Sequence, residues 1–111
     1  HRITVIDRQD QFVFIPSLIW VPFGWRTPKQ ITFPLRASLE PRGIEFRLGT
    51  VEKIDPDRQV VTVSEAARPG EQEEIAYDYL LIATGPFVNF GVVPGLGPHG
   101  GFTHSICTVE H

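Results

Sequence analysis

The stretch that decides the fold is YDYLLIATGP, residues 77–86. Residues 79–83 are an almost unbroken apolar run, which predicts a strand buried on both faces. The run leads into Thr84-Gly85-Pro86, and the small residues Ala83 and Gly85 leave no bulky side chain between the backbone and an approaching ligand. The sequence therefore predicts a ligand-binding turn after a buried strand, with a simple tight turn as the alternative.

A second buried strand is predicted at the start of the chain. Ile3-Thr4-Val5-Ile6 is β-branched throughout and stops at Asp7, and ligands of parallel sheets bind at such carboxyl ends. The following run, residues 11–25, is aromatic and rich in proline, with neither a helical nor a strand period. We expect so apolar a loop to be covered by a ligand, a partner domain or a lipid surface.

A short helix is predicted between these regions, over residues 33–42. Thr32 is a possible N-cap, Pro34 suits the first turn, Pro41 limits the length and Gly43 is the expected terminator.

Closely spaced strands follow the helix. Turn residues 55–57 and a polar loop at 64–72 separate them, which predicts an antiparallel meander. The whole pattern is that of an α/β fold with parallel strands, an antiparallel meander and one short helix. The predicted strands of the meander are 44–48, 51–54, 59–63 and 74–77.

Composition narrows the class of protein. The 111 residues are 41% hydrophobic and carry a formal net charge of -3, which argues against a nucleic-acid-binding module. No apolar stretch approaches the ~20 residues of a membrane-spanning helix. One cysteine excludes an internal disulfide. The chain has no initiator Met or leader, and neither end falls in a polar linker. We therefore expect this chain to be an excerpt of a longer protein, and we expect the excerpt itself to be soluble.

The run HSICTVEH, residues 104–111, holds the only cysteine, Cys107, between His104 and His111. A structural zinc site needs about four ligands, and these residues supply at most three, with Glu110 a poor fourth. A small buried hydrophobic residue is the ordinary alternative for Cys107. We predict no metal site, although a structural or metal-binding module remains the non-enzymatic alternative for the isolated chain.

The run DYLLIATGP, preceded by a meander and by a strand ending in Asp, resembles the pyridine nucleotide-disulfide oxidoreductase superfamily of flavoproteins. Within it the chain is most similar to the sulfide:quinone oxidoreductases, with the type II NADH dehydrogenases as the competing family. The discriminating run is SICTVEH, because a cysteine followed four residues later by a histidine is expected of the former family and not of the latter.

The resemblance implies that residues 1–111 are a single partial Rossmann-like FAD/NAD(P)-binding domain, with FAD as the cofactor of the parent protein. The superfamily's glycine-rich G-x-G-x-x-G turn is absent from this chain, so we expect only part of an FAD site. In the superfamily a first strand with this turn precedes the strand that begins here at Ile3, and the resemblance implies that this chain lacks it. Edges of the parallel sheet would then be exposed, so we expect dimerisation or strand exchange and no tight binding of FAD by the isolated chain.

The resemblance also assigns cofactor-binding roles. Asp7 would accept hydrogen bonds from the adenosine ribose, where a solvated charge beside Arg8 is the alternative. The backbone of Thr50 and Val51 would meet the adenine, or these are ordinary strand residues. Pro16 would lie near the flavin on the quinone side, with core packing of its aromatic neighbours as the alternative. The turn residues expected close to the cofactor are Ala83, Thr84, Gly85 and Pro86.

The catalytic candidates implied by the resemblance are Cys107 and His111. Cys107 would be the first of three redox cysteines and would handle sulfur, because a thiolate is both a nucleophile and a leaving group. His111 would handle a proton near neutral pH, where a merely solvated histidine is the alternative. The implied partners are sulfide and a membrane quinone, with peripheral membrane association through a C-terminal part outside this chain.

Overall fold

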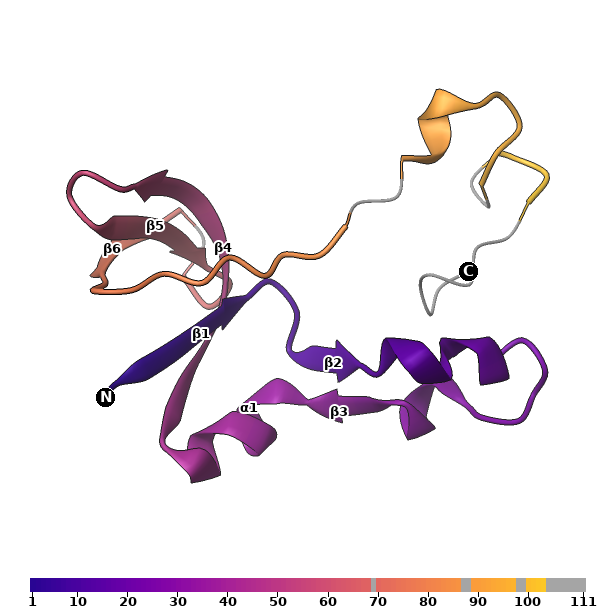
Figure 1. The fold of residues 1–111 in the computed structure, drawn as a ribbon, viewed down its shortest axis with the longest axis horizontal. Helices are drawn as coiled ribbons and strands as arrows, with labels where there is room; N and C mark the ends of the chain where they lie inside the picture. The colour runs from indigo at the N-terminus through magenta and orange to yellow at the C-terminus, as the bar shows by residue number, and fades with distance from the viewer. Residues whose placement is uncertain (69, 87–88, 98–99, 104–111) are drawn as a thin grey trace. The chain divides into compact units, whose positions relative to one another are not determined.

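The computed structural model describes residues 1–68, 70–86, 89–97 and 100–103. They form a four-stranded sheet of order β1-β4-β5-β6 and a two-stranded sheet of β2 and β3 (Figure 1). The chain divides into two compact units: His1–Phe12 with Pro34–Ile82, and Val13–Phe33 with the described residues from Ala83 onward. The elements in chain order are β1 (Ile3–Asp7), β2 (Gln11–Val13), η1 (Ile15–Trp20), η2 (Pro28–Gln30), β3 (Thr32–Pro34), α1 (Leu35–Leu39), η3 (Glu40–Arg42), β4 (Ile44–Asp55), β5 (Val60–Glu65), β6 (Gln72–Ala76) and η4 (Phe90–Val92).

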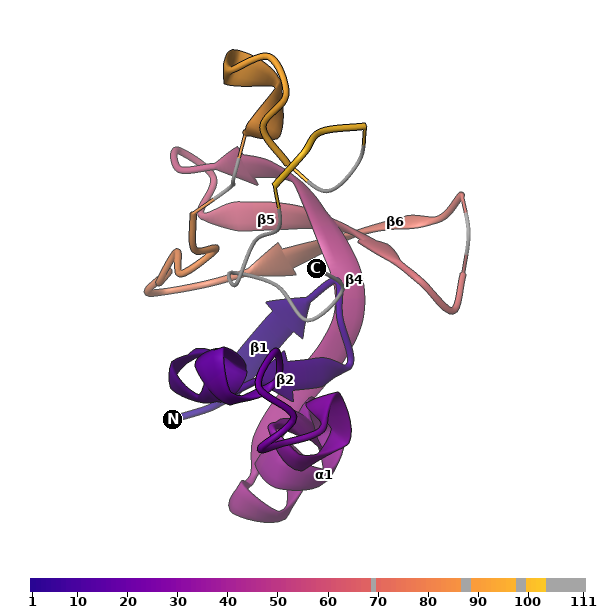
Figure 2. The ribbon, with the colours of Figure 1, turned by 90° about the vertical axis from the view of Figure 1, so that its right-hand side faces the viewer.

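The long strand β4 organises the first unit. Its residues 44–48 pair with β1 in parallel, and its residues 49–55 pair with β5 in antiparallel orientation. β6 completes the meander beside β5. Figure 2 shows β4 curving from β1 to the meander. The predicted α/β class, with parallel and antiparallel pairing in one sheet, is confirmed.

The prediction of two separate strands at 44–48 and 51–54 was wrong, because β4 is continuous over twelve residues. The strand contains a shift of register between Val51 and Lys53. Such a bulge bends a strand and strengthens its twist without ending it. The strand therefore remains one element although its pairing with β5 is irregular.

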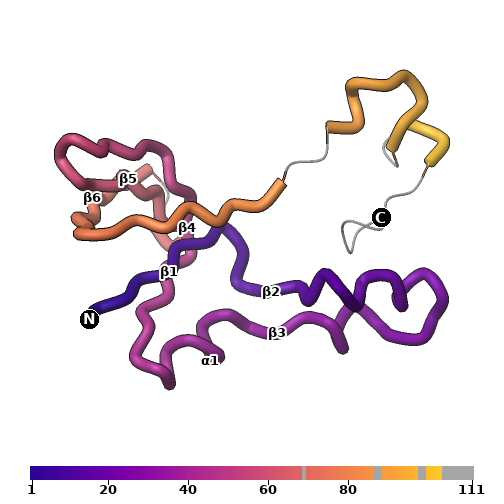
Figure 3. The backbone as a smooth tube through the Cα atoms, viewed as in Figure 1, coloured from indigo at the N-terminus to yellow at the C-terminus, as the bar shows by residue number. Residues whose placement is uncertain are grey.

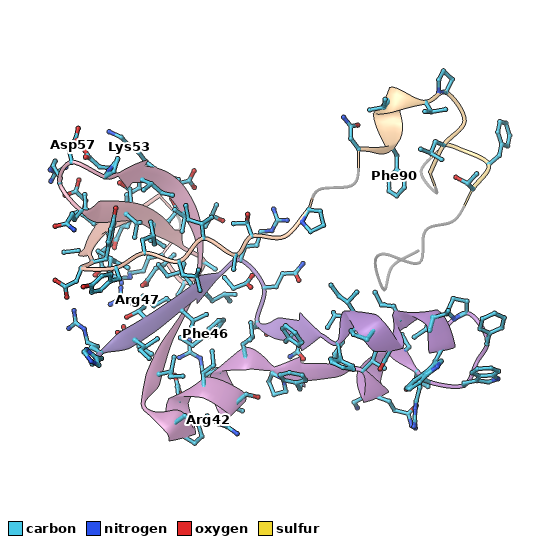
Figure 4. The ribbon with its side chains drawn as sticks, viewed as in Figure 1. Arg42, Phe46, Arg47, Lys53, Asp57 and Phe90 are labelled. Carbon is cyan, nitrogen blue, oxygen red and sulfur yellow. The ribbon has the colours of Figure 1, made fainter. Side chains whose placement is uncertain are left out.

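The core of the first unit comes from alternating residues of β4 and β5. Phe46, Val61 and Val63 are buried, and Val63 is completely so. The next residue along β4, Arg47, points to the other face, as strand geometry requires; both side chains are labelled in Figure 4. The Arg36 guanidinium of α1 lies 5.4 Å from the centre of the Phe46 ring, so the short helix covers this core through a cation–π contact.

The helix region is shorter than predicted. The regular turn covers only Leu35–Leu39, and Pro41 lies in the tighter 3₁₀ turn that follows, since proline lacks the N–H of a continuing α-helix. Gly43 ends the region at φ 74°, as predicted. Thr32 is not the N-cap: it opens β3, and its hydroxyl donates to the Pro28 carbonyl.

The apolar run 79–83 is not a buried strand, which overturns that prediction. No described residue pairs with it, and Tyr79 and Leu81 are 97% and 88% exposed. Figure 3 shows it continuing from β6 as extended backbone. An extended apolar segment becomes a strand only where another strand supplies hydrogen bonds, and β1 pairs only with β4 among the described residues.

β2 and β3 pair as the base of a hairpin whose residues 13–33 belong to the second unit. Ser17, Leu18 and Ile31 are its buried residues, and the Phe14 N–H donates to the Ile31 carbonyl at 2.8 Å. The loop predicted to lack regular structure thus contains β2 and the 3₁₀ turns of η1. None of the helices in the described ranges has the length and apolar character to cross a bilayer.

Candidate functional site

Asp7 lies where the sequence placed it, at the carboxyl end of a parallel strand. Its side chain is exposed, and its Oδ1 accepts a hydrogen bond from the Gln9 N–H at 2.9 Å. That bond closes a local turn and fixes the direction of the carboxylate. Oδ2 has no hydrogen bond to a described residue and is available to a hydroxyl group.

Val51 lies immediately before the bulge of β4 and is 41% exposed. Thr50 and Val51 still pair with Ser64 and Val63, so their peptide groups belong to the β4–β5 ladder on one side. The extra residue of the bulge, Glu52, opposes no partner, which frees peptide groups at this point. A ring docking against backbone would find polar groups here.

The turn that follows the apolar run is open to its surroundings. Ala83, Thr84, Gly85 and Pro86 are all exposed. Gly85 has φ 71°, and no atom lies within 4 Å of the place where a Cβ would stand. The left-handed conformation and the empty space together let a ligand approach the peptide groups of this turn.

Pro16 is the second residue of the 3₁₀ turn η1 and is exposed. Among the aromatic residues near it in sequence, Trp20 contacts a cation: the Arg26 guanidinium lies 5.7 Å from the centre of the Trp20 ring. Trp20, Trp25 and Arg26 line a shallow, open depression on the second unit. The core-packing alternative for Trp20 is therefore not what the structure shows, since this residue is 39% exposed.

Cys107 and His111 lie outside the described residues, as does His104, so their proposed roles stay predictions. Within residues 1–68, 70–86, 89–97 and 100–103, no group of three or more His, Cys, Asp or Glu side chains could hold a metal ion.

The electrostatics of the first unit centre on Arg47. It contacts carboxylate oxygens of Glu45 at 2.8 Å, Glu65 at 3.1 Å and Glu73 at 2.7 Å. The hydrogen bond to Glu45 is the main cause that raises the pKa of Arg47, and it likewise lowers the pKa of Glu45. These ion pairs join β4, β5 and β6 on one face of the meander, so the role of the cluster is to hold strands together.

A match to the family described as "Pyridine nucleotide-disulphide oxidoreductase" covers residues 1–111. The chain belongs to this family. The predicted superfamily is thereby confirmed, and its members bind FAD, in agreement with the predicted cofactor.

Individual members of the family show the nearer likeness. The chain is 39% identical to the sulfide-quinone reductase of Aquifex aeolicus over 99% of its own length and 23% of that protein. The X-ray structure of the Aquifex aeolicus sulfide:quinone oxidoreductase superposes with a TM-score of 0.76, again over 99% of this chain and 23% of that one.

Relatives of the competing family are more distant. The external alternative NADH-ubiquinone oxidoreductase of Yarrowia lipolytica is 25% identical over 96% of this chain and 19% of its own. The structure of NDH2 from Plasmodium falciparum in complex with NADH has a TM-score of 0.69 at 19% identity, covering 86% of this chain and 20% of that one, and so shares the fold. The chain spans about a quarter of the length of these relatives or less.

The residues present suit the parts of FAD that the sequence assigned to them. An exposed carboxylate at a strand end can accept from ribose hydroxyls, as Asp7 could. The irregular backbone beside Val51 offers peptide groups, and the Gly85 turn offers open backbone that a Cβ would block. Each of these groups fits by itself, and its assignment to FAD stays a prediction.

Two structural residues escaped the sequence interpretation. Gly49 is buried where β4 changes partners, and a glycine inside an apolar strand was the available signal. Arg26 lines the open depression together with Trp20 and Trp25, and the available signal was an arginine directly after Trp25 in a segment without carboxylates.

Proposed function

We propose that this chain is part of an FAD-dependent sulfide:quinone oxidoreductase, which oxidises sulfide and passes the electrons through FAD to a membrane quinone. The observation that supports this most is the 39% identity to the Aquifex aeolicus sulfide-quinone reductase over 99% of the chain. Because the chain spans 23% of that relative, the activity belongs to a larger protein.

The overall reaction is HS⁻ + quinone + H⁺ → S⁰ + quinol, with the sulfur held as polysulfide or released in elemental form. FAD, when bound, supplies a two-electron acceptor between the two substrates. In this proposal Asp7 holds ribose hydroxyls, the backbone at Val51 faces the adenine, and the peptide groups of Thr84 and Gly85 approach the cofactor.

Cys107 is proposed to carry the sulfur. Its thiolate form is the reactive one, so a lowered pKa would favour attack on a sulfur bridge and later release of the sulfur chain. His111, four residues on, is proposed to hold or supply the proton that accompanies this exchange near neutral pH. Both roles rest on the SICTVEH pattern.

The test uses the complete flavin-loaded protein under anaerobic conditions. Sulfide should bleach the flavin absorbance, and a short-chain quinone should restore it; Cys107→Ala should lower sulfide-dependent quinone reduction at least tenfold while dithionite still bleaches its flavin. Thr108→Ala, one residue away, is the matched control and should keep its rate. Flavin reduction by NADH and not by sulfide would reject the proposal.

A type II NADH:quinone dehydrogenase is the second candidate, favoured by the 25% identity to the Yarrowia lipolytica NADH-ubiquinone oxidoreductase over 96% of the chain. It predicts rapid flavin reduction by NADH and no loss of activity in Cys107→Ala. The same two reductants therefore separate the candidates. In either case the electron acceptor is a lipid-soluble quinone, and we propose that the protein works at a membrane surface as a peripheral protein.

A further inference from the structure

The hairpin loop of the second unit differs in charge from the rest of the chain. Residues 11–39 carry Arg26, Lys29 and Arg36 and no Asp or Glu, although the chain has thirteen carboxylate side chains and a net charge of -3. Arg36 pairs with Glu40 just beyond this segment. Arg26 and Lys29 form no ion pair with a described residue, so this part of the loop presents two cations that no described carboxylate neutralises.

Within this segment, residues 15–29 form the loop that we call the aromatic loop. It exposes large apolar side chains. Trp25 is 70% exposed, Phe23 66% and Ile15 64%. The rings of Phe23 and Trp25 lie 5.3 Å apart, and the Arg26 guanidinium lies over Trp20. Aromatic rings and an unpaired cation therefore line one open depression.

Backbone hydrogen bonds hold this arrangement. The Trp25 N–H donates to the Trp20 carbonyl at 3.0 Å, and the Gly24 N–H donates to the Val21 carbonyl at 2.9 Å. The Thr27 N–H donates to Gln30 Oε1 at 2.9 Å, which closes the turn that carries Lys29. The rings are thus presented outward by an ordered loop with its own small core.

We propose that the aromatic loop is a contact surface for an anionic phospholipid bilayer. Trp and Phe rings are favoured at the level of the lipid headgroups, where one end of the ring is apolar and the other wet. Arg26 and Lys29 meet the lipid phosphates, and the lack of carboxylates removes repulsion from an anionic surface. The rest of the chain carries the net negative charge, which an anionic surface repels.

The inference rests on the loop alone and is independent of the proposed reaction. A second copy of this chain is the competing occupant, because its acidic residues could meet the same cations. The two differ in what buries the rings: hydrocarbon in one case, protein in the other.

The chain offers a built-in probe, because both of its tryptophans, Trp20 and Trp25, lie in the aromatic loop. The chain is mixed with phosphatidylcholine vesicles containing about one third phosphatidylglycerol, and with vesicles of phosphatidylcholine alone. We expect a blue shift of the emission and quenching by brominated acyl chains with the anionic vesicles. Raising the salt from 50 to 500 mM should weaken the binding, since the attraction to the headgroups is screened.

Variants separate the charge from the rings. Removing both cations in Arg26→Gln/Lys29→Gln should lower partitioning by roughly 30-fold, at about fivefold for each cation near an anionic surface. Lys53→Gln, which removes an exposed cation of β4, is the matched control and should partition normally. Phe23→Ala should weaken binding, whereas Phe102→Ala, 93% exposed outside the loop, should not.

Far-UV circular dichroism checks that each variant is folded. The proposal is overturned if the wild-type chain ignores anionic vesicles, if it binds them without bromine quenching of its tryptophans, or if Lys53→Gln weakens binding as much as the double variant. A blue-shifted emission and a dimer by light scattering before any lipid is added, with no further change on adding vesicles, would assign the loop to a second copy instead.

Discussion

At the scale of single residues, Gly49 shows how one missing side chain permits the sheet. A Cβ added there would stand 2.8 Å from the Ser64 carbonyl oxygen and 3.0 Å from Val63 Cγ1. The carbonyl belongs to β5 and cannot move without breaking the ladder. β4 can therefore pass from β1 to β5 only with glycine at this position.

Gly49→Ala is expected to lower the free energy of unfolding by about 1–3 kcal/mol, the usual cost of overpacking a well-packed site. Urea unfolding followed by circular dichroism measures it. Gly91→Ala is the control, because its Cβ would meet only the Asn89 side chain, at 3.3 Å, and should change the midpoint little. Equal midpoints for wild type and Gly49→Ala would show that the strands separate there.

The exposed pair of Arg58 and Glu74 gives a pH-dependent prediction. Hydrogen bonds from the Arg58 guanidinium, at 2.8 and 2.6 Å, lower the pKa of the Glu74 carboxyl. A carboxyl whose pKa is depressed in the folded state contributes stability above its unfolded pKa and loses it as the pH falls through the folded value. The pair therefore stabilises the meander at neutral pH and not in strong acid, and both side chains are exposed enough for salt to weaken the effect.

Carboxyl-carbon NMR titration should give Glu74 a lower pKa in the wild type than in Arg58→Ala. If the pKa of Glu74 does not rise in Arg58→Ala, the ion pair does not persist in solution.

At the scale of elements, the run 79–83 and strand β5 have similar sequences but differ in strand pairing. Both are apolar and β-prone, yet β5 has a partner on each side and the run has none among the described residues. Amide hydrogens without a bonding partner exchange with solvent through small local openings.

We expect the amides of Leu80 and Leu81 to exchange with deuterium at least tenfold faster than those of Val61 and Val63. Hydrogen-exchange mass spectrometry or NMR on the isolated chain measures it. In the complete flavoprotein the exchange at 80–81 should slow if another strand pairs there. Equal protection of both segments in the isolated chain would mean that the run already has a partner.

At the scale of the whole molecule, unpaired edges and exposed apolar residues favour association. β1 and β6 are the edge strands of the described four-stranded sheet. The side chains of the run 79–82 are exposed, and its backbone pairs with no described strand. Exposed edges and apolar segments pair readily with other chains. The predicted dimer or strand exchange is therefore a proposal for the isolated chain.

Light scattering at two concentrations is expected to show a dimer whose fraction rises with concentration. Added FAD should elute separately on gel filtration, because we expect this chain to supply only part of an FAD site. A monomer that keeps yellow flavin through gel filtration would contradict both expectations.

Local chemistry made several features predictable. Strand β1 ends at Asp7 because β-branched residues give way to a charged residue, the helix region ends at Gly43 because glycine adopts φ 74° without strain, and the turn after Asp55 follows from its own residues. The local geometry of the cofactor candidates was predictable in the same sense, because Asp7 at a strand end and Gly85 in a turn depend on their own residue types.

The sequence by itself determined the family and the order of the elements in the meander, because these depend on neighbours along the chain. Only the tertiary structure decided that β4 is one strand, that Gly49 must lack a side chain, that Arg26 lies over Trp20, and that 79–83 pairs with no described residue. The physical reason is that strand formation and side-chain contact require partners distant in sequence, and a local pattern does not specify whether such a partner is there.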